Sequence, residues 1–421
     1  MIHPSAVEQA WNCKPQLVLA ICAAIWALAS LISLSSGDQL RYPDEKDYHN
    51  LALNFAHRNG FVDENLQPSA ARPPGYPLLL SAVYALWERP LAAKLLNSFV
   101  CGFTALVLSL IASAIGNRIA GIVAPFLVLC FPLFSYTAST LYPQTVGTLL
   151  FVSAILFLVR FPFSSKATII AGVLFGFLVL TIPSFLLLLP LFPAWLLIVD
   201  RSSTPLFRRA LIFLCCAVFV VAPWTFRNFI QFKSFVPVST NTGINLLLGN
   251  SPNTKPDSGV NVDISGYLEA AKGMNEIEKD NFFKRSAISF MKENPLAALQ
   301  LYLRKVVNYF NFRNQLYTSS ESSSLRDTVM LLTYYPLLLL VVIRLLLYRR
   351  FKISQPEALL VLVYFGNAFL SAIFFTRIRF RIPFDALLIV LVAIFIGLIY
   401  SKRETLLAGI RHGRLGWNRA K

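Results

Sequence analysis

Residues 17–34 read LVLAICAAIWALASLISL, and residues 42–53 read YPDEKDYHNLAL. The first stretch is apolar and almost long enough to cross a bilayer, since about 20 helical residues span roughly 30 Å of hydrocarbon. The second stretch places Asp44, Glu45 and Asp47, with His49, a few residues past the end of that span. The two stretches predict a transmembrane helix that leads directly into a cluster of carboxylates.

The composition extends this prediction to the whole chain. Of its 421 residues, 56% are hydrophobic and only 14% are charged, whereas soluble domains carry about 25% charged residues. We therefore predict an all-α polytopic membrane protein. The ten predicted spans lie near residues 17–35, 93–115, 119–137, 142–160, 167–182, 184–199, 210–224, 328–347, 356–375 and 382–400. The segment 75–87 is too short to span and is expected to be an interfacial helix.

The net charge of +17 fits a membrane protein better than a nucleic-acid-binding one. With the N-terminus inside, basic residues gather in the inner loops and tail, as the positive-inside rule requires. This topology divides the chain into an N-terminal transmembrane module (1–224) with an outer catalytic loop (36–92), an extracytoplasmic segment (225–327), C-terminal helices (328–400) and a basic cytoplasmic tail (401–421). We expect membrane lipids as partners, no nucleic acid, and a bacterial inner membrane as the location, with the active site facing outward.

The segment 225–327 is the longest polar part of the chain. Residues 235–259 are rich in Asn, Thr, Gly and Pro and are expected to be irregular or short-stranded. The following residues have helical periodicity, and Pro295 is expected to divide them into two amphipathic helices that lie along the membrane surface.

The carboxylates after the first span are candidate catalytic groups. A carboxylate beside an apolar wall has a raised pKa and can act as a general base, which makes Asp44 and Glu45 candidates. An ordinary solvated loop is the plainer interpretation. Asp44, Asp47 and His49 are also residue types that bind a hard metal ion, but the sequence contains no second ligand cluster, so a divalent metal stays open and no metal site is predicted.

Arginines on the predicted outer side could bind a phosphate, because guanidinium is the preferred bidentate partner of that group. AARPPGYP (70–77) holds Arg72 on a stiff backbone, and TRIRFRIPFD (376–385) supplies three more arginines. APWTFRNF (222–229) adds a further arginine and an asparagine, and the Asn-rich run after it could bind sugar hydroxyls. Alternatively, these side chains only anchor the chain at lipid headgroups. The candidate phosphate ligands are Arg72, Arg227, Arg377, Arg379 and Arg381; the candidate substrate ligands are Asp47, Tyr48, Asn228 and Asn245.

Carboxylates beside a phosphate clamp indicate transfer of a sugar from a lipid-linked phosphate. An acceptor hydroxyl, deprotonated by a carboxylate, would attack the anomeric carbon, and the arginines would stabilise the departing phosphate. A single displacement would invert the configuration. The acceptor could be a glycan, a lipid or a protein.

The motifs YPDEKDY, RPPGYPLLL, PWTFRNF, FVPVSTNTGINLLLGN and RFRIPFDALLIVL, in this order, resemble those of bacterial GT-C glycosyltransferases. The similarity is greatest to the branch of protein O-mannosyltransferases and lipid A aminoarabinose transferases. The resemblance implies a bundle of membrane helices, a polyprenyl-phosphate sugar donor, Asp44 as the base with Glu45 beside it, a substrate contact at Tyr48 and a donor-phosphate contact at Arg72.

The chain also departs from these relatives. Ala71 and Asp47 stand where the aminoarabinose transferases carry an acid and an arginine, and Gln144 stands where many relatives carry Glu. These differences argue against an aminoarabinose donor and a lipid A acceptor. The alternative functions are a lipid-linked glycan polymerase or ligase, a non-enzymatic flippase or transporter, and a subunit of a larger glycosylation complex.

Overall fold

The computed structural model describes residues 15–161, 163–199, 205–313 and 323–417. Apart from one isolated β-bridge between Val62 and Pro68, the regular secondary structure within them is helical, with 17 α-helices and one 3-10 helix. Six helices are long and apolar enough to cross a membrane, so the chain is an integral membrane protein. These six are α2 (Pro15–Ser36), α5 (Pro90–Ile115), α11 (Pro205–Phe232), α16 (Ser324–Leu346), α17 (Gln355–Ile373) and α18 (Ile378–Trp417).

The remaining four predicted spans correspond to shorter apolar helices. Pro132 separates two of these helices, and Pro183 begins the 3-10 helix, because proline cannot donate the hydrogen bond that would continue an α-helix. The predicted interfacial helix is α4 (Gly75–Tyr84). The shorter elements of the bundle are α6 (Arg118–Leu129), α7 (Leu133–Ala138), α8 (Gln144–Arg160), α9 (Ser165–Thr181), η1 (Pro183–Leu188) and α10 (Leu191–Val199).

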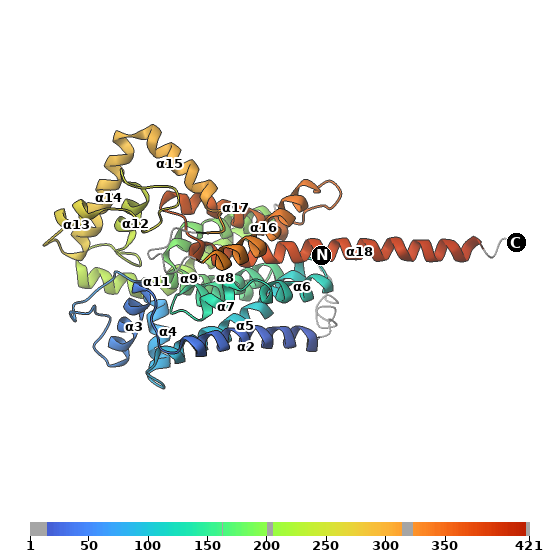
Figure 1. Ribbon diagram of the computed structural model, residues 1–421, viewed down its shortest axis with the longest axis horizontal. Helices are drawn as coiled ribbons and strands as arrows, with labels where there is room; N and C mark the ends of the chain where they lie inside the picture. Colours follow the sequence, from blue (N-terminus) through green and yellow to red (C-terminus); the bar gives the residue numbers. More distant parts are fainter. Residues whose placement is uncertain (1–14, 162, 200–204, 314–322, 418–421) are drawn as a thin grey trace.

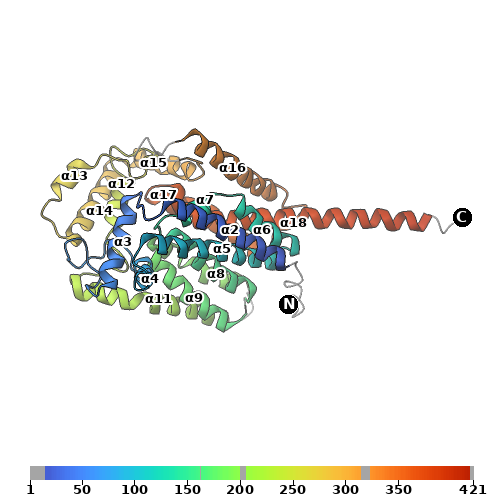
Figure 2. The same cartoon turned by 60° about the horizontal axis from the view of Figure 1, so that its bottom comes forward.

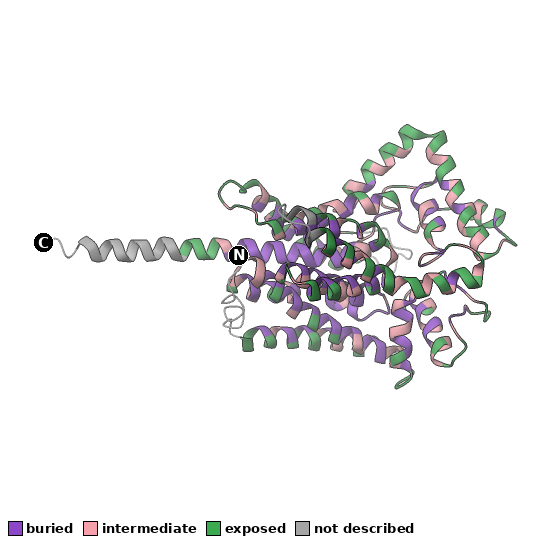
Figure 3. Cartoon of the chain, turned by 180° about the vertical axis from the view of Figure 1, so that it is seen from behind, coloured by how far each residue is buried: buried purple, intermediate pink, exposed green. Residues whose placement is uncertain are grey.

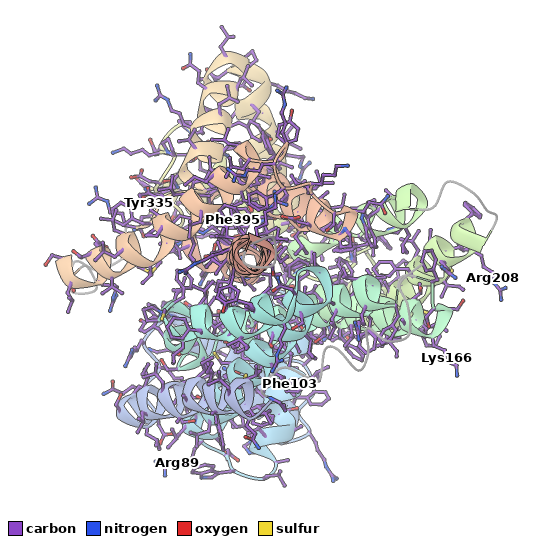
Figure 4. All side chains as sticks on the ribbon, turned by 90° about the vertical axis from the view of Figure 1, so that its right-hand side faces the viewer. Arg89, Phe103, Lys166, Arg208, Tyr335 and Phe395 are labelled. Carbon is purple, nitrogen blue, oxygen red and sulfur yellow. The ribbon has the colours of Figure 1, made fainter. Side chains whose placement is uncertain are left out.

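Helix α18 forms the centre of the bundle. Figure 4, which looks along this helix, shows it surrounded by the others, and Figure 3 shows its first half buried. In the most apolar 18-residue stretch of α18, 83% of the residues are buried, against 17% in that of α11. It packs on α5, α6, α8, α16 and α17. Because the first half of α18 is packed among these helices, its first turn has a fixed position relative to them.

Five further helices, none of them a candidate span, gather at the end of the molecule opposite the end of α18 (Figures 1 and 2). They are α3 (Pro43–Ala56), α12 (Thr242–Gly249), α13 (Ser265–Ala270), α14 (Glu276–Glu293) and α15 (Pro295–Asn308). The break at Pro295 is where the sequence predicts it. The expectation of an irregular or short-stranded segment at 235–259 is wrong in its middle, where residues 242–249 form α12 and Leu247 and Leu248 pack against α14.

A buried lysine fastens this polar region to the membrane helices. Lys305 of α15 is fully buried and its Nζ donates to the carbonyl oxygens of Gly249 (2.9 Å) and Phe374 (2.7 Å) and to Oδ1 of Asn250 (3.1 Å). These acceptors lie at the C-terminal ends of α12 and α17, so one side chain joins three elements.

Candidate active site

Helix α3 brings the predicted acidic residues to the polar end of the bundle. Pro43 occupies its first turn, where a proline costs nothing because that N–H has no partner in the helix. Residues three and four apart in a helix share a face, and Asp44, Asp47 and Tyr48 therefore point the same way. Glu45, the next residue after Asp44, points to another side.

Asp44 lies between two arginines that come from distant parts of the chain. Its Oδ1 accepts from Nη2 of Arg72 at 2.5 Å, and its Oδ2 accepts from Nη1 of Arg379 at 2.6 Å. Arg72 also binds Asp47 through Nη2 (2.6 Å) and Nε (3.1 Å). Three regions, namely α3, the segment before α4 and the first turn of α18, thus meet at one carboxylate.

These arginines reverse the expected direction of the pKa shift of Asp44. Burial raises the pKa of this carboxyl, as the sequence suggests, but the charges and hydrogen bonds of Arg379 and Arg72 outweigh burial and lower the pKa to about 2. Asp44 is therefore ionised at neutral pH. It is suited to accept a hydrogen bond from a hydroxyl and to orient it, more than to hold its proton.

The proline-rich segment 70–77, which carries Arg72, is held in place by several contacts. A Cβ at Gly75 would lie 2.9 Å from the carbonyl carbon of Leu180, so only glycine lets this segment lie against α9. Ala70 donates its N–H to Glu276 (2.8 Å) and accepts from the N–H of Thr240 (2.9 Å). The Arg72 guanidinium lies 5.6 Å from the Tyr48 ring centre, a cation–π contact.

Asp44, Arg72 and Arg379 line a cavity of about 340 Å³. Near them lie Tyr48, Tyr142 and Gln144, and the cavity continues along an apolar wall that includes Leu186, Leu187 and Leu370. Asn245 also lines it, as a candidate sugar ligand would. One cavity therefore has a charged end and an apolar wall.

Glu45 does not face this cavity. It is 1% exposed; its Oε2 accepts from the backbone N–H groups of Arg41 (2.6 Å) and Tyr42 (2.9 Å), and its Oε1 accepts from that of Leu141 (2.8 Å). Both oxygens are occupied in holding the start of α3 against the loop before α8. The structure therefore gives Glu45 a structural place and not the catalytic one expected from the sequence.

The three arginines of TRIRFRIPFD do not form one clamp. Arg381 is fully buried, pairs with Asp385 (2.9 Å) and donates to the carbonyl oxygen of Tyr309 (2.7 Å). Residues two apart in a helix point in nearly opposite directions, so Arg381 faces the protein core while Arg379 faces the cavity. Arg377, just before α18, is half-buried beside Arg379 and outside the cavity lining; burial and the neighbouring charge of Arg379 lower its pKa to about 10.

The structure also places Arg227 and Asn228 away from the cavity. Arg227 stacks on Trp224 (4.8 Å) and donates to the carbonyl oxygens of Ser69 and Phe61, both at 2.9 Å. Asn228 is fully buried and donates to the carbonyl oxygen of Val236 at 3.1 Å. α11 continues to Phe232, so both side chains brace loops at its end and neither is placed to bind a donor phosphate or a sugar.

The metal alternative finds no support in this geometry. Asp44 and Asp47 are paired with arginines, and Nδ1 of His49 lies 2.9 Å from the Tyr84 hydroxyl. Within the described residues there is no group of three or more His, Cys, Asp or Glu side chains arranged to hold a metal ion.

Two residues near the charged end have roles that sequence reasoning missed. The Tyr142 ring lies 4.9 Å from the Arg379 guanidinium and covers one of its faces. Gln144, noted in the sequence only as a departure, begins α8; it is 5% exposed, and its Oε1 has no hydrogen-bond partner in the described structure. Tyr142 and Gln144 flank Pro143, and a Pro before an apolar helix signals its start, but no sequence signal shows that both reach the cavity.

Comparison with known proteins supports the fold. No protein-family model matches the chain, and no curated protein matches it by sequence. Among solved structures, the Archaeoglobus fulgidus oligosaccharyltransferase in the apo form matches with a TM-score of 0.54 and 14% identity, covering 92% of this chain and 52% of that one. The oligosaccharyltransferase AglB from the same organism, in complex with an inhibitory peptide and a dolichol-phosphate, matches with a TM-score of 0.52 and 15% identity over 92% and 51% of the two chains. ArnT from Cupriavidus metallidurans bound to undecaprenyl phosphate gives a TM-score of 0.45 at 14% identity, over 90% of this chain and 77% of that one.

The chain is therefore similar in fold to the GT-C membrane glycosyltransferases over about nine-tenths of its length. It spans about half the length of the archaeal oligosaccharyltransferases that it matches. At this level of identity the likeness concerns the fold alone, and the chemistry has to be argued from the residues of the cavity.

Proposed function

We propose that this protein is an inverting glycosyltransferase that moves a sugar from a polyprenyl-phosphate donor to an acceptor hydroxyl on the outer face of a bacterial membrane. The observation that carries the proposal is the single cavity in which a carboxylate, held between two arginines, lies at one end of an apolar wall. A lipid-linked phosphosugar has the matching parts: an anionic phosphate, a polar sugar and an apolar chain.

The donor phosphate would bind at Arg72 and Arg379. Nε of Arg379 is buried and has no hydrogen-bond partner in the described structure, so this guanidinium can bind a phosphate oxygen while it keeps its contact with Asp44. The start of the polyprenyl chain would lie along Leu186, Leu187 and Leu370. The dolichol-phosphate in the complex of AglB, which shares the fold, supports a lipid phosphate as the ligand class.

The reaction would be one displacement at the anomeric carbon. The acceptor oxygen, hydrogen-bonded to Asp44, forms a bond to this carbon as the bond from the carbon to the phosphate oxygen breaks. The electron pair leaves with the polyprenyl phosphate, whose new negative charge is stabilised by the two arginines. The acceptor proton passes by way of Asp44 to the phosphate, because a phosphate monoester has its second pKa near 6 and is a better final acceptor than a carboxyl with a pKa of about 2.

Sugar transfer by the purified protein tests the proposal. The donors are polyprenyl phosphates that carry different sugars, the acceptors are a panel of lipids, glycans and peptides, and the variant is Asp44→Asn. We expect Asp44→Asn to lower the transfer rate by about 100- to 10,000-fold, the range for loss of a general base, and to retain donor binding. Asp38→Asn is the matched control, because Asp38 pairs with Arg89 at the protein surface.

Two outcomes would contradict the proposal, the first as a whole and the second in the role of Asp44. Donor binding without transfer to any acceptor would favour the flippase or subunit function. Full transfer by Asp44→Asn would leave a glycosyltransferase but remove Asp44 from the reaction, as a polymerase or ligase with a different base would require.

A further inference from the structure

We propose that the sugar carried by the donor is electrically neutral and that Gln144 accepts a hydrogen bond from one of its hydroxyl or N-acetyl N–H groups. This inference rests on the proposed function and concerns the identity of the substrate. It follows from the charges around the cavity and from one buried amide.

The first observation is the state of the carboxylates. Asp44 is the only carboxylate that lines the cavity within the described residues, and both its oxygens are bound to guanidinium groups. Outside the cavity lining, Glu276 accepts from the backbone N–H of Ala70 and the Thr240 hydroxyl, and Asp280 accepts from the N–H of Gly243 and from Lys284. A sugar with an ammonium group would thus meet two arginines and no unpaired carboxylate, which is unfavourable in a partly desolvated site.

The second observation is the net charge at the charged end. Among the described residues that line the cavity, Asp44 stands against Arg72 and Arg379, which leaves one positive charge. The phosphodiester of a lipid-linked sugar carries one negative charge and balances it. A uronic acid would bring a second negative charge that nothing in this cluster neutralises.

The third observation is Gln144 itself. Its side chain lines the same cavity as Asp44 and Arg379 and lies two residues after Tyr142, whose ring covers Arg379. Its Oε1 is buried without a partner in the described structure. A buried acceptor without a donor is costly, and a sugar hydroxyl or N–H would satisfy it. Apart from Asp44, Arg72 and Arg379, the polar side chains among the described lining residues are uncharged; they include Ser184, Ser239, Asn241, Thr242 and Asn245.

Competition binding tests the inference. Purified protein is loaded with a labelled polyprenyl phosphate, which is displaced by polyprenyl phosphates that carry a neutral hexose, an N-acetylhexosamine, a sugar with a free amine or a uronic acid. We expect the two neutral donors to bind at least ten-fold more tightly than the two charged ones. Gln144→Leu should weaken the neutral donors by at least five-fold and leave bare polyprenyl phosphate unchanged. Gln144→Glu should shift the preference at least ten-fold toward the free amine.

The matched controls are Gln67→Leu and Gln67→Glu, since Gln67 is exposed and lies outside the cavity lining. A charged donor that binds as tightly as a neutral one, or neutral donors that bind Gln144→Leu as well as the wild type, would overturn the inference and leave the proposed function intact. Failure of every polyprenyl phosphate to bind would overturn the proposed function itself.

Discussion

Replacement of Arg379 by glutamine should weaken donor binding without unfolding the protein. The side chain is 23% exposed, and it contacts Asp44 at 2.6 Å. The energy of interest is the attraction between the Arg379 guanidinium and the donor phosphate. Two opposite charges about 4 Å apart attract by about 4 kcal/mol at an effective dielectric constant near 20. Desolvation of the two groups offsets part of this attraction, and hydrogen bonds to charged groups contribute about 1.5–3 kcal/mol net. At 1.4 kcal/mol per factor of ten, Arg379→Gln should raise the Kd for polyprenyl phosphate by about 10- to 150-fold.

The assay is equilibrium binding of a labelled polyprenyl phosphate, with thermal unfolding measured on the same samples. Arg89→Gln is the control for loss of one positive charge, because Arg89 forms an exposed ion pair with Asp38. The Kd of Arg379→Lys should fall between those of Arg379→Gln and Arg89→Gln, since lysine keeps the charge and loses the planar fork of donors. A Kd for Arg379→Gln within two-fold of the wild-type value, at an unchanged Tm, would show that this arginine does not bind the phosphate.

Three further predictions concern structural residues. Glu45→Gln should lower the free energy of unfolding by about 1–3 kcal/mol, because the amide N–H₂ of glutamine must face a backbone N–H group. Affinity for the lipid-linked sugar should persist. Equal stability of variant and wild type in thermal unfolding would contradict the structural role of Glu45. Gly249→Ala should lower the Tm as well, since a Cβ there overlaps the main-chain carbonyl of Phe374; an unchanged Tm would show that α12 can move away. Burial lowers the pKa of Lys305 to about 7, so the unfolded state binds an extra proton between this value and about 10.4, and stability should rise with pH across that window. Thermal unfolding of the wild type and of Lys305→Met between pH 6 and about 10 checks the direction of this pH dependence, because the variant lacks the titrating amine. Parallel plots of Tm against pH for the two proteins would refute the prediction.

The helical bundle could be predicted from hydropathy because burial in lipid demands long apolar runs. All ten predicted spans fall on apolar helices, although four of them are shorter than a full span. The helix α12 could not be predicted from the sequence, because its eight residues lie between Asn and Pro signals that are typical of loops. Its apolar face is decided by packing against α14, which only the tertiary structure shows.

The parts of the site that could be predicted are those in which helical geometry alone decides which side chains share a face. Once 43–56 is helical, Asp44 and Asp47 share a face and Glu45 does not. In the same way, the spacing of Arg381 and Asp385 by four residues could have indicated an ion pair within α18. The approach of Arg379 to Asp44, however, joins residues 335 positions apart in the sequence. No local pattern encodes that contact, and it sets the direction of the Asp44 pKa shift.

The central position of α18 has a consequence for biosynthesis. In the sequence this helix follows all the helices that surround it, so during synthesis the earlier spans must leave a slot for it. Until α18 enters, Asp44 lacks Arg379 and the charged end of the cavity is incomplete. The pairing of Asp44 with two arginines is thereby coupled to insertion of α18, because Arg379 lies in the first turn of that helix.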